Sequence, residues 1–161
     1  MPDRKGNIKC PACGEEMTEI FMPEQGINID VCLNGCGGIF FNNREFKHFD
    51  AKDQNIDTLL EAMKGKNFSQ VHETTTTRTC PVCGAAMVKN YSSATKQIQV
   101  DDCYSCGGKF LDYGELIKIR EEGDYNDAMQ TVCSIAGLDF HDERRNQEAV
   151  KKLFDSLINK K

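Results

Sequence analysis

Apolar and polar residues alternate along two short stretches of the chain. Ile27, Ile29 and Val31 are separated by single polar residues, and Ile98 and Val100 follow the same alternation about seventy positions later. Successive side chains of a strand point to opposite faces, so the alternation predicts two half-buried β-strands.

Two other stretches have the spacing of a helix. In the first, the apolar residues end before Gly65 and predict a helix of about three turns; they are Ile56, Leu59, Leu60 and Met63. In the second, near the C-terminus, an apolar stripe recurs at helical spacing; it consists of Val150, Leu153, Phe154, Leu157 and Ile158. The four threonines at 74–77 favour an extended strand, because β-branched side chains suit a pleated surface.

The chain also contains an internal repeat. The motif at residues 10–14, Cys-Pro-Ala-Cys-Gly, recurs seventy positions later as Cys-Pro-Val-Cys-Gly at 80–84, and the Cys-Gly-Gly at 36–38 recurs at 106–108. These matches at separated points indicate two copies of one module. Each module is predicted to be a knuckle, a hairpin, a second knuckle and a short helix. Asn42 with Glu45, and their counterparts Asp112 with Glu115, have the spacing of a capping box at that helix's start. This reading is favoured over a carboxylate pair for acid–base chemistry.

Eight of the nine cysteines form two sets of paired thiols, with eighteen residues between the pairs in the first module and nineteen in the second. This spacing is typical of zinc sites, because two thiolates on one tight turn can occupy adjacent corners of a tetrahedron and a hairpin returns the second pair. We therefore expect two zinc ions per chain. The predicted ligands are Cys10, Cys13, Cys32 and Cys36 in the first module and Cys80, Cys83, Cys103 and Cys106 in the second.

A site with four protein ligands has no open position, so zinc here is expected to be structural and the chain is expected not to be an enzyme. Disulfides, four-thiolate iron and thiol redox chemistry remain as less favoured alternatives. The ninth cysteine, Cys133, is interpreted as a buried inert thiol, and Met17 and Met87 as core residues beneath the knuckles. His48, His72 and His141 are isolated and are expected at the surface.

Net charge and hydropathy restrict the location and the partner. No secretory signal and no apolar stretch of bilayer length are present, so a cytoplasmic protein without membrane contact is expected. The formal net charge is -5, and two four-thiolate zinc sites would take it to about -9. A generic nucleic-acid-binding protein is expected to be basic, so the charge does not favour nucleic acid.

The second module carries the motif Cys-Pro-x-Cys-Gly, a hairpin that ends in Asp, and then Cys-x-x-Cys-Gly-Gly-x-Phe-Leu-Asp-x-x-Glu-Leu. It resembles the transcription-factor-type zinc-finger family, whose ribbons are similar to that of transcription factor IIB. The resemblance covers about residues 8–50 and 78–120 and implies zinc binding and a ribbon fold. Phe110 stands where the family usually has Trp. The first module departs at Asn42, where the family usually has Asp, and has one extra residue between its second pair of cysteines.

These observations predict a small metal-stabilised α+β protein with two zinc ribbons. The expected parts are a first ribbon at 1–50, a linker with an amphipathic helix at 51–77, a second ribbon at 78–121 and a helical C-terminal segment at 122–161. The C-terminal helix is expected to pack on the ribbons rather than on a partner.

The expected function is that of a non-catalytic protein-binding or regulatory adaptor, with a role related to transcription suggested by the resemblance. The alternative is nucleic-acid binding by the second ribbon. Its hairpin offers Lys89, Tyr91 and Lys96 as a small basic and aromatic face on which bases could stack.

Overall fold

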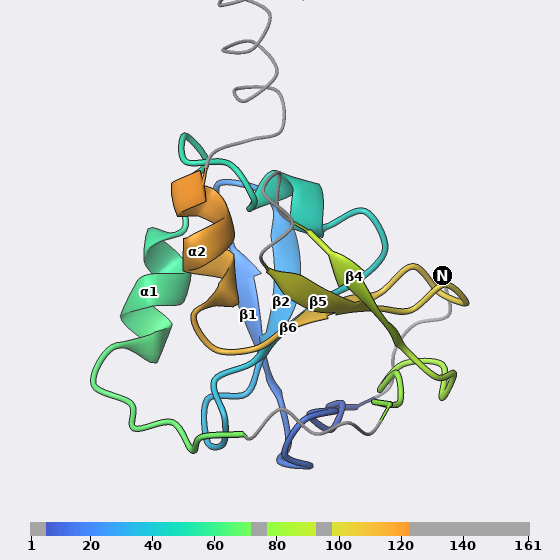
Figure 1. Ribbon diagram of the computed structural model, residues 1–161. Coiled ribbons are helices and arrows are strands. Elements are labelled where there is room, and N and C mark those ends of the chain that lie inside the picture. Colours follow the sequence, from blue (N-terminus) through green and yellow to red (C-terminus); the bar gives the residue numbers. More distant parts are fainter. Residues whose placement is uncertain (1–5, 72–76, 93–97, 123–161) are drawn as a thin grey trace, which may run out of the picture.

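The computed structural model describes residues 6–71, 77–92 and 98–122 (Figure 1). Six strands form one antiparallel sheet in the order β1-β2-β3-β6-β5-β4. Because the first three come from the first ribbon and the last three from the second, the two ribbons share a single sheet. The strands are β1 (Thr18–Met22), β2 (Ile27–Val31), β3 (Ile39–Phe41), β4 (Val88–Tyr91), β5 (Gln99–Asp102) and β6 (Lys109–Leu111).

Two apolar clusters account for the core. One contains Ile29 and Val31 of β2 and Val100 of β5, so the alternating residues of the sequence do point to a common interior. The other contains five of the cysteines that were predicted to be ligands, together with Met17 and Met87, and the partly buried Cys106 packs against it. Asp30 lies between these two apolar residues of β2 and is also only 2% exposed. It pairs with Phe40, a member of the second cluster, so the second cluster covers the other face of β2 here. The C-terminal part of the strand is therefore buried on both faces, whereas Asn28, on the same face as Asp30, is exposed as the predicted half-buried strand requires.

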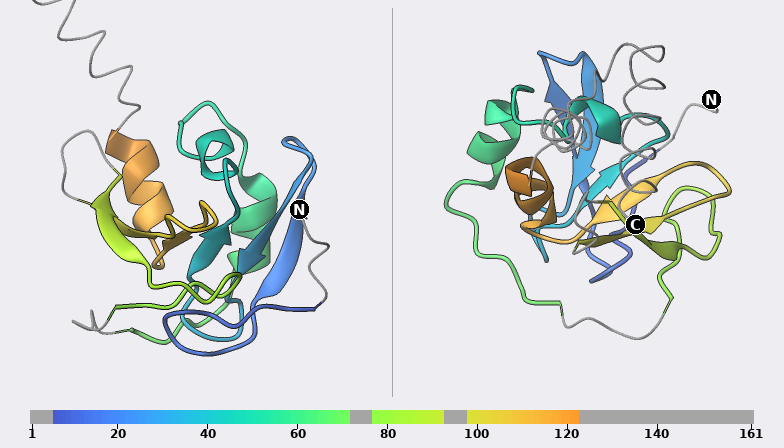
Figure 2. Two further views of the ribbon diagram at one scale, coloured as in Figure 1. Left: turned by 90° about the vertical axis from the view of Figure 1, so that its right-hand side faces the viewer. Right: turned by 45° about the horizontal axis from the view of Figure 1, so that its top comes forward.

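The helices belong to the first of these clusters and lie to one side of the sheet, as the views in Figure 2 show. They are α1 (Asp57–Met63), α2 (Glu115–Glu122) and a single 3-10 turn, η1 (Phe46–His48). Within the described ranges no helix has the length and apolar character that crossing a membrane requires.

The helix predicted before Gly65 is confirmed as α1, although its seven residues make about two turns and not three. Leu59 is buried, as the spacing indicated, whereas Leu60 is exposed. The predicted strand at 74–77 and the predicted C-terminal helix lie outside the described residues, apart from Thr77, which is not in a strand.

The predicted capping box is present only in part. The Glu115 carboxylate accepts a hydrogen bond from the Asp112 backbone N–H at 2.7 Å, and Glu45 accepts one from the Asn42 N–H at the same distance. However, Gly114 has a φ of 86° and the Glu115 N–H donates to the Asp112 carbonyl at 3.1 Å. These are features of a type II turn, in which the third residue has positive φ. α2 therefore begins at Glu115, after the turn.

The strands β3 and β6 join the two ribbons, and the repeat makes their junction symmetric. Phe40 pairs with Phe110 at the centre of this antiparallel contact. A methyl group on Gly38 would overlap the Phe110 ring, and a methyl group on Gly108 would overlap the Phe40 ring. Neither glycine has positive φ, so the phenyl rings, and not the backbone conformation, require glycine here.

The first prediction concerns this exchange of rings and glycines. Gly38→Ala should lower the free energy of unfolding by about 1–3 kcal/mol, because the added methyl group overpacks the Phe110 ring. In a Phe110→Ala background, which is itself destabilised by about 3–5 kcal/mol, the same change should cost much less. The measurement is urea unfolding of the zinc-loaded single and double variants.

Gly65→Ala is the control for backbone strain alone. Gly65 has a φ of 70° and has nothing within 4 Å of an added methyl group. Its substitution should cost about 1 kcal/mol in both backgrounds. If Phe110→Ala left the cost of Gly38→Ala unchanged, the ring contact would not be the reason for the glycine.

Candidate metal centres

The first centre is built from two turns that the sheet brings together. Cys10 and Cys13 precede β1, whereas Cys32 and Cys36 lie between β2 and β3. The Sγ atoms of Cys10 and Cys36 are 3.5 Å apart, and those of Cys13 and Cys32 are 3.4 Å apart. All four sulfurs lie within 4.8 Å of one another.

The second centre repeats this arrangement with the corresponding four cysteines. The Sγ atoms of Cys80 and Cys106 are 3.6 Å apart, and those of Cys83 and Cys103 are 3.4 Å apart. In the described part of the chain, these two sets are the groups of ligand-type side chains close enough to hold a metal ion. All eight predicted ligands are thus brought together in the predicted sets.

The sulfur spacing fits a tetrahedral metal ion and not a disulfide. Zinc–sulfur bonds of about 2.3 Å place neighbouring sulfurs of a tetrahedron about 3.8 Å apart, close to the distances found here. A disulfide would need about 2.05 Å, and the eight cysteines are not bridged. Four soft thiolates in this geometry are a donor set for zinc.

Backbone geometry explains why a glycine follows the second cysteine of each pair. The Gly14 N–H donates to the Cys10 carbonyl and the Gly84 N–H to the Cys80 carbonyl, each at 2.9 Å. These glycines have φ values of 82° and 76°, in the left-handed region where only glycine is unstrained. Gly37 and Gly107, which follow the second pair of cysteines in each ribbon, also have positive φ.

The extra residue in the first ribbon widens its second knuckle without separating the sulfurs. The Gly37 N–H donates to the carbonyl of Cys32, five residues earlier, whereas the Gly107 N–H donates to that of Cys103, four residues earlier. A methyl group on Gly35 would lie 2.7 Å from the sulfurs of both Cys13 and Cys32. The widened knuckle therefore depends on a glycine that lies directly against the thiols.

Burial and backbone dipoles give the thiols different proton affinities. Burial raises the pKa of Cys32 and of Cys80 to about 12. At Cys83, which is exposed, a hydrogen bond from the Ala85 backbone N–H lowers the pKa of the thiol to about 6. Metal binding must therefore displace protons from the buried thiols at neutral pH, and zinc affinity is expected to fall as the pH falls.

A buried ion-pair network lies beside the second centre and was not predicted from the sequence. The Arg78 guanidinium lies 2.7 Å from Asp101 and 2.9 Å from Asp112, and its carbon is 5.2 Å from the centre of the Phe110 ring. Arg78 is only 8% exposed. The Lys89 ammonium also reaches Asp101, at 3.0 Å.

The repeat accounts for the Asn at position 42. Arg78 corresponds to Ile8, which is also buried, and Asp112 corresponds to Asn42. The first ribbon therefore replaces the cation and one of its two carboxylate partners by uncharged residues, whereas the other partner, Asp101, keeps a counterpart in Asp30. Comparison of residues 8 and 42 with residues 78 and 112 in the aligned repeats would have revealed this paired replacement from the sequence alone.

Other residues that the sequence singled out lie away from the centres or pack beneath them. Met17 and Met87 are buried among the thiols, as expected of core residues. His48 is exposed, as predicted. Cys133, His72 and His141 lie outside the described residues.

Comparison with protein families agrees with the geometry. The family model described as Transcription factor zinc-finger matches residues 9–51 and 79–122, together more than half of the chain. The chain belongs to this family. The two matched ranges correspond to the two ribbons, and their four-cysteine clusters fit two zinc ions per chain. Searches among curated proteins and among solved structures gave no match.

The second prediction tests the ligand assignment. Elemental analysis of the purified protein should find two zinc ions per chain, and Cys83→Ser should reduce the content to one, because three thiolates hold zinc far less tightly than four. Cys133→Ser is the matched control and should retain both ions. A Cys133→Ser variant that lost an ion, or a Cys83→Ser variant that kept two, would contradict the assignment.

The third prediction concerns the buried ion pairs. Arg78→Ile should lower the free energy of unfolding by about 3–5 kcal/mol, because it leaves the Asp112 carboxylate without its cation and the buried Asp101 with Lys89 alone. Adding Asp112→Asn reproduces the Ile8 and Asn42 of the first ribbon and should recover about 1–2 kcal/mol. Urea unfolding of the zinc-loaded variants measures both values. A double variant no more stable than Arg78→Ile would show that the exchange in the first ribbon is not compensatory.

Proposed function

We propose that the chain is a non-catalytic adaptor that binds a protein partner through its second ribbon, with zinc serving to hold the binding surface in shape. The observation that carries this proposal is a set of exposed apolar side chains on the two knuckles and the edge strand of the second ribbon. We name it the ribbon-two surface; it consists of Val82, Val88, Tyr91 and Tyr104, which are 41%, 44%, 56% and 73% exposed. Val88 and Tyr91 lie on opposite faces of β4, so a partner that pairs with this edge strand would contact both.

The ribbon-two surface lies where a partner could reach it. Val82 and Tyr104 are on the two zinc knuckles, and Val88 and Tyr91 are on β4, the strand at one edge of the sheet (Figure 1). The Asn90 side chain of β4 contacts the Tyr104 hydroxyl, so the second knuckle lies against this strand. Exposed tyrosines are enriched in protein interfaces, and an edge strand can pair with an extended peptide.

The charges of the second ribbon support a protein partner over nucleic acid. Arg78, Lys89 and Lys109 are paired with carboxylates of the same ribbon. Arg120 donates hydrogen bonds to the carbonyls of Phe49 and Gln54, at 2.7 and 2.6 Å. These cations are already engaged and would have to be released before they could neutralise phosphates.

The non-catalytic part of the proposal rests on the ligand sets. Each centre offers four thiols to one ion, which leaves no coordination position for a substrate or for an activated water. Zinc ribbons of this family are typically non-catalytic. A role related to transcription is proposed from the description of the family alone.

The fourth prediction tests the partner class. Zinc-loaded protein used as bait in a cell extract should retain a protein partner after nuclease treatment. The variant Tyr91→Ala with Tyr104→Ala should lose that partner, because truncating two interface tyrosines removes on the order of 2 kcal/mol or more from binding. Capture is measured by quantitative mass spectrometry of the retained proteins.

The matched control is Phe21→Ala with Leu60→Ala. These residues are similarly exposed, at 58% and 45%, but lie on β1 and α1. This variant should capture the partner as the wild type does. Capture that disappears with nuclease, together with salt-dependent binding of the purified protein to DNA or RNA, would overturn the proposal in favour of a nucleic-acid-binding ribbon.

A further inference from the structure

A segment of the linker covers the first metal centre. Residues 68–71, which we name the strap, cross the widened knuckle after α1. The Ser69 N–H donates to the Gly35 carbonyl at 3.0 Å. The Phe68 ring lies against Gly37 so closely that an added methyl group would be 2.8 Å from the ring. On its other side this ring packs on Tyr113 of the second ribbon, with centroids 4.8 Å apart.

The extra residue of the first ribbon provides the anchor for the strap. Gly35 is one of three residues between Cys32 and Cys36, whereas only two residues separate Cys103 and Cys106. The carbonyl that accepts the hydrogen bond from the Ser69 N–H thus belongs to the three-residue form of the knuckle, which the second ribbon lacks. The departure from the family spacing has a structural use: it holds the strap over the first centre.

The strap changes the exposure of one ligand. Cys36, beside the strap, is 3% exposed, whereas its counterpart Cys106 is only partly buried. At the corresponding place in the second ribbon, the Asn43 side chain lies against Gly107. In the described residues, therefore, a main-chain segment crosses the first centre and a single polar side chain approaches the second.

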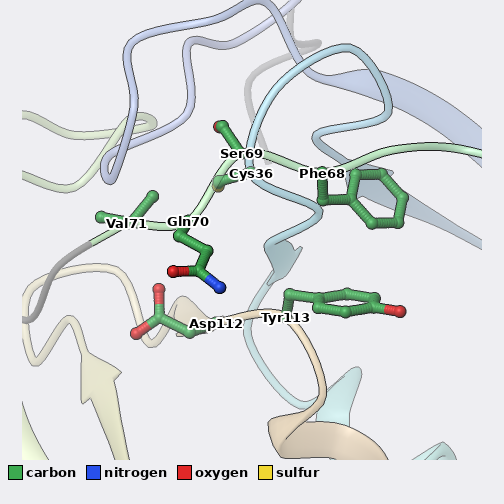
Figure 3. A pocket seen from close by; sticks show the side chains of 7 residues that line it. All are labelled: Cys36, Phe68, Ser69, Gln70, Val71, Asp112 and Tyr113. Carbon is green, nitrogen blue, oxygen red and sulfur yellow. The ribbon is translucent and has the colours of Figure 1, made fainter.

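The strap is held by the Ser69 hydrogen bond, by the Phe68 ring and by Val71, which packs against the cluster of cysteines. Beyond Ser69, a pocket of about 340 Å³ separates it from the second ribbon, with Gln70 and Val71 on one side, Asp112 on the other and Cys36 in the wall (Figure 3). A segment of four residues that belongs to no helix or strand can open locally while the sheet stays folded. Opening of the strap would then be the step that exposes Cys36 to a competing ligand.

We propose that the two zinc ions are kinetically inequivalent: the strap retains the ion of the first centre, whereas the ion of the second centre exchanges with free zinc and competing chelators. In each exchange, zinc leaves as the divalent ion and the thiolates take up protons or another ion, so no oxidant is needed. The proposal is independent of whether the ribbon-two surface binds a protein.

The fifth prediction follows the two ions separately. The full zinc-loaded chain is mixed with excess 4-(2-pyridylazo)resorcinol, which reports released zinc by absorbance. Release should have two phases of one ion each, with rates that differ about tenfold or more. Iodoacetamide added after the fast phase, followed by peptide mass spectrometry, should label Cys80, Cys83, Cys103 and Cys106 while the cysteines of the first centre stay protected.

Two variants remove the strap contacts by different means. Phe68→Ala deletes the ring over Gly37, and Ser69→Pro deletes the N–H that binds the Gly35 carbonyl. Each should accelerate the slow phase about tenfold towards the fast phase and leave the fast phase unchanged. Circular dichroism before chelator is added identifies a variant that fails to fold, and the fast phase provides an internal standard in those that do.

Asn43→Ala is the matched control, because it alters the residue over Gly107 and should leave the slow phase at the wild-type rate. The proposal is overturned if both ions of the wild type leave in one phase or if the first centre is alkylated first. It is equally overturned if both strap variants fold and release the slow ion at the wild-type rate.

Discussion

Coordination of four thiolates to one ion is the interaction on which this structure depends. One of the two apolar clusters contains the cysteines themselves, so without the ions its centre would consist of thiols that attract one another weakly. The hairpins beside it have strands of four or five residues, and isolated hairpins of that length are marginal in water. A structural zinc ion contributes on the order of 10–16 kcal/mol, more than a small apolar core supplies.

The metal centres and the shared sheet reinforce each other. The last knuckle cysteine of each ribbon is followed by two glycines and a short strand, and the two short strands pair across the repeat. The glycines that end the knuckles are the ones that receive the phenyl rings of the other ribbon. Loss of either ion would therefore disturb the junction of the ribbons as well as the local knuckle.

Much of the candidate site could be predicted from the sequence because its chemistry is local. The spacing of the cysteines and the glycine after each pair determine the tight turns, and the repeat shows that both sets have the same design. The alternation at Ile29 and Val31 identified one buried face correctly. It could not show that Asp30 is buried as well, because the second cluster on the other face is assembled from residues distant in sequence.

The features that were not predicted are contacts between distant segments. Pairing of β3 with β6 joins residues about seventy positions apart, and strands of three residues have no periodicity that could reveal it. The buried ion pairs of Arg78 were not predicted, because its partners Asp101 and Asp112 come close only in the folded second ribbon. The strap, similarly, is too short to show a periodicity, and its position depends on where α1 ends.

The near-twofold relation between the ribbons has a consequence for how such a chain could arise. Phe40 meets Gly108 just as Phe110 meets Gly38, so each ribbon presents the same surface to the other, as the subunits of a symmetric homodimer do. A half-length ancestor with one ribbon would have carried this self-complementary edge. Covalent fusion keeps the two halves at a high effective concentration, so a junction of two short strands suffices where separate molecules would have dissociated. Fusion would also allow the two halves to diverge. The second ribbon has the network of ion pairs, whereas the first ribbon has the metal centre that the strap covers.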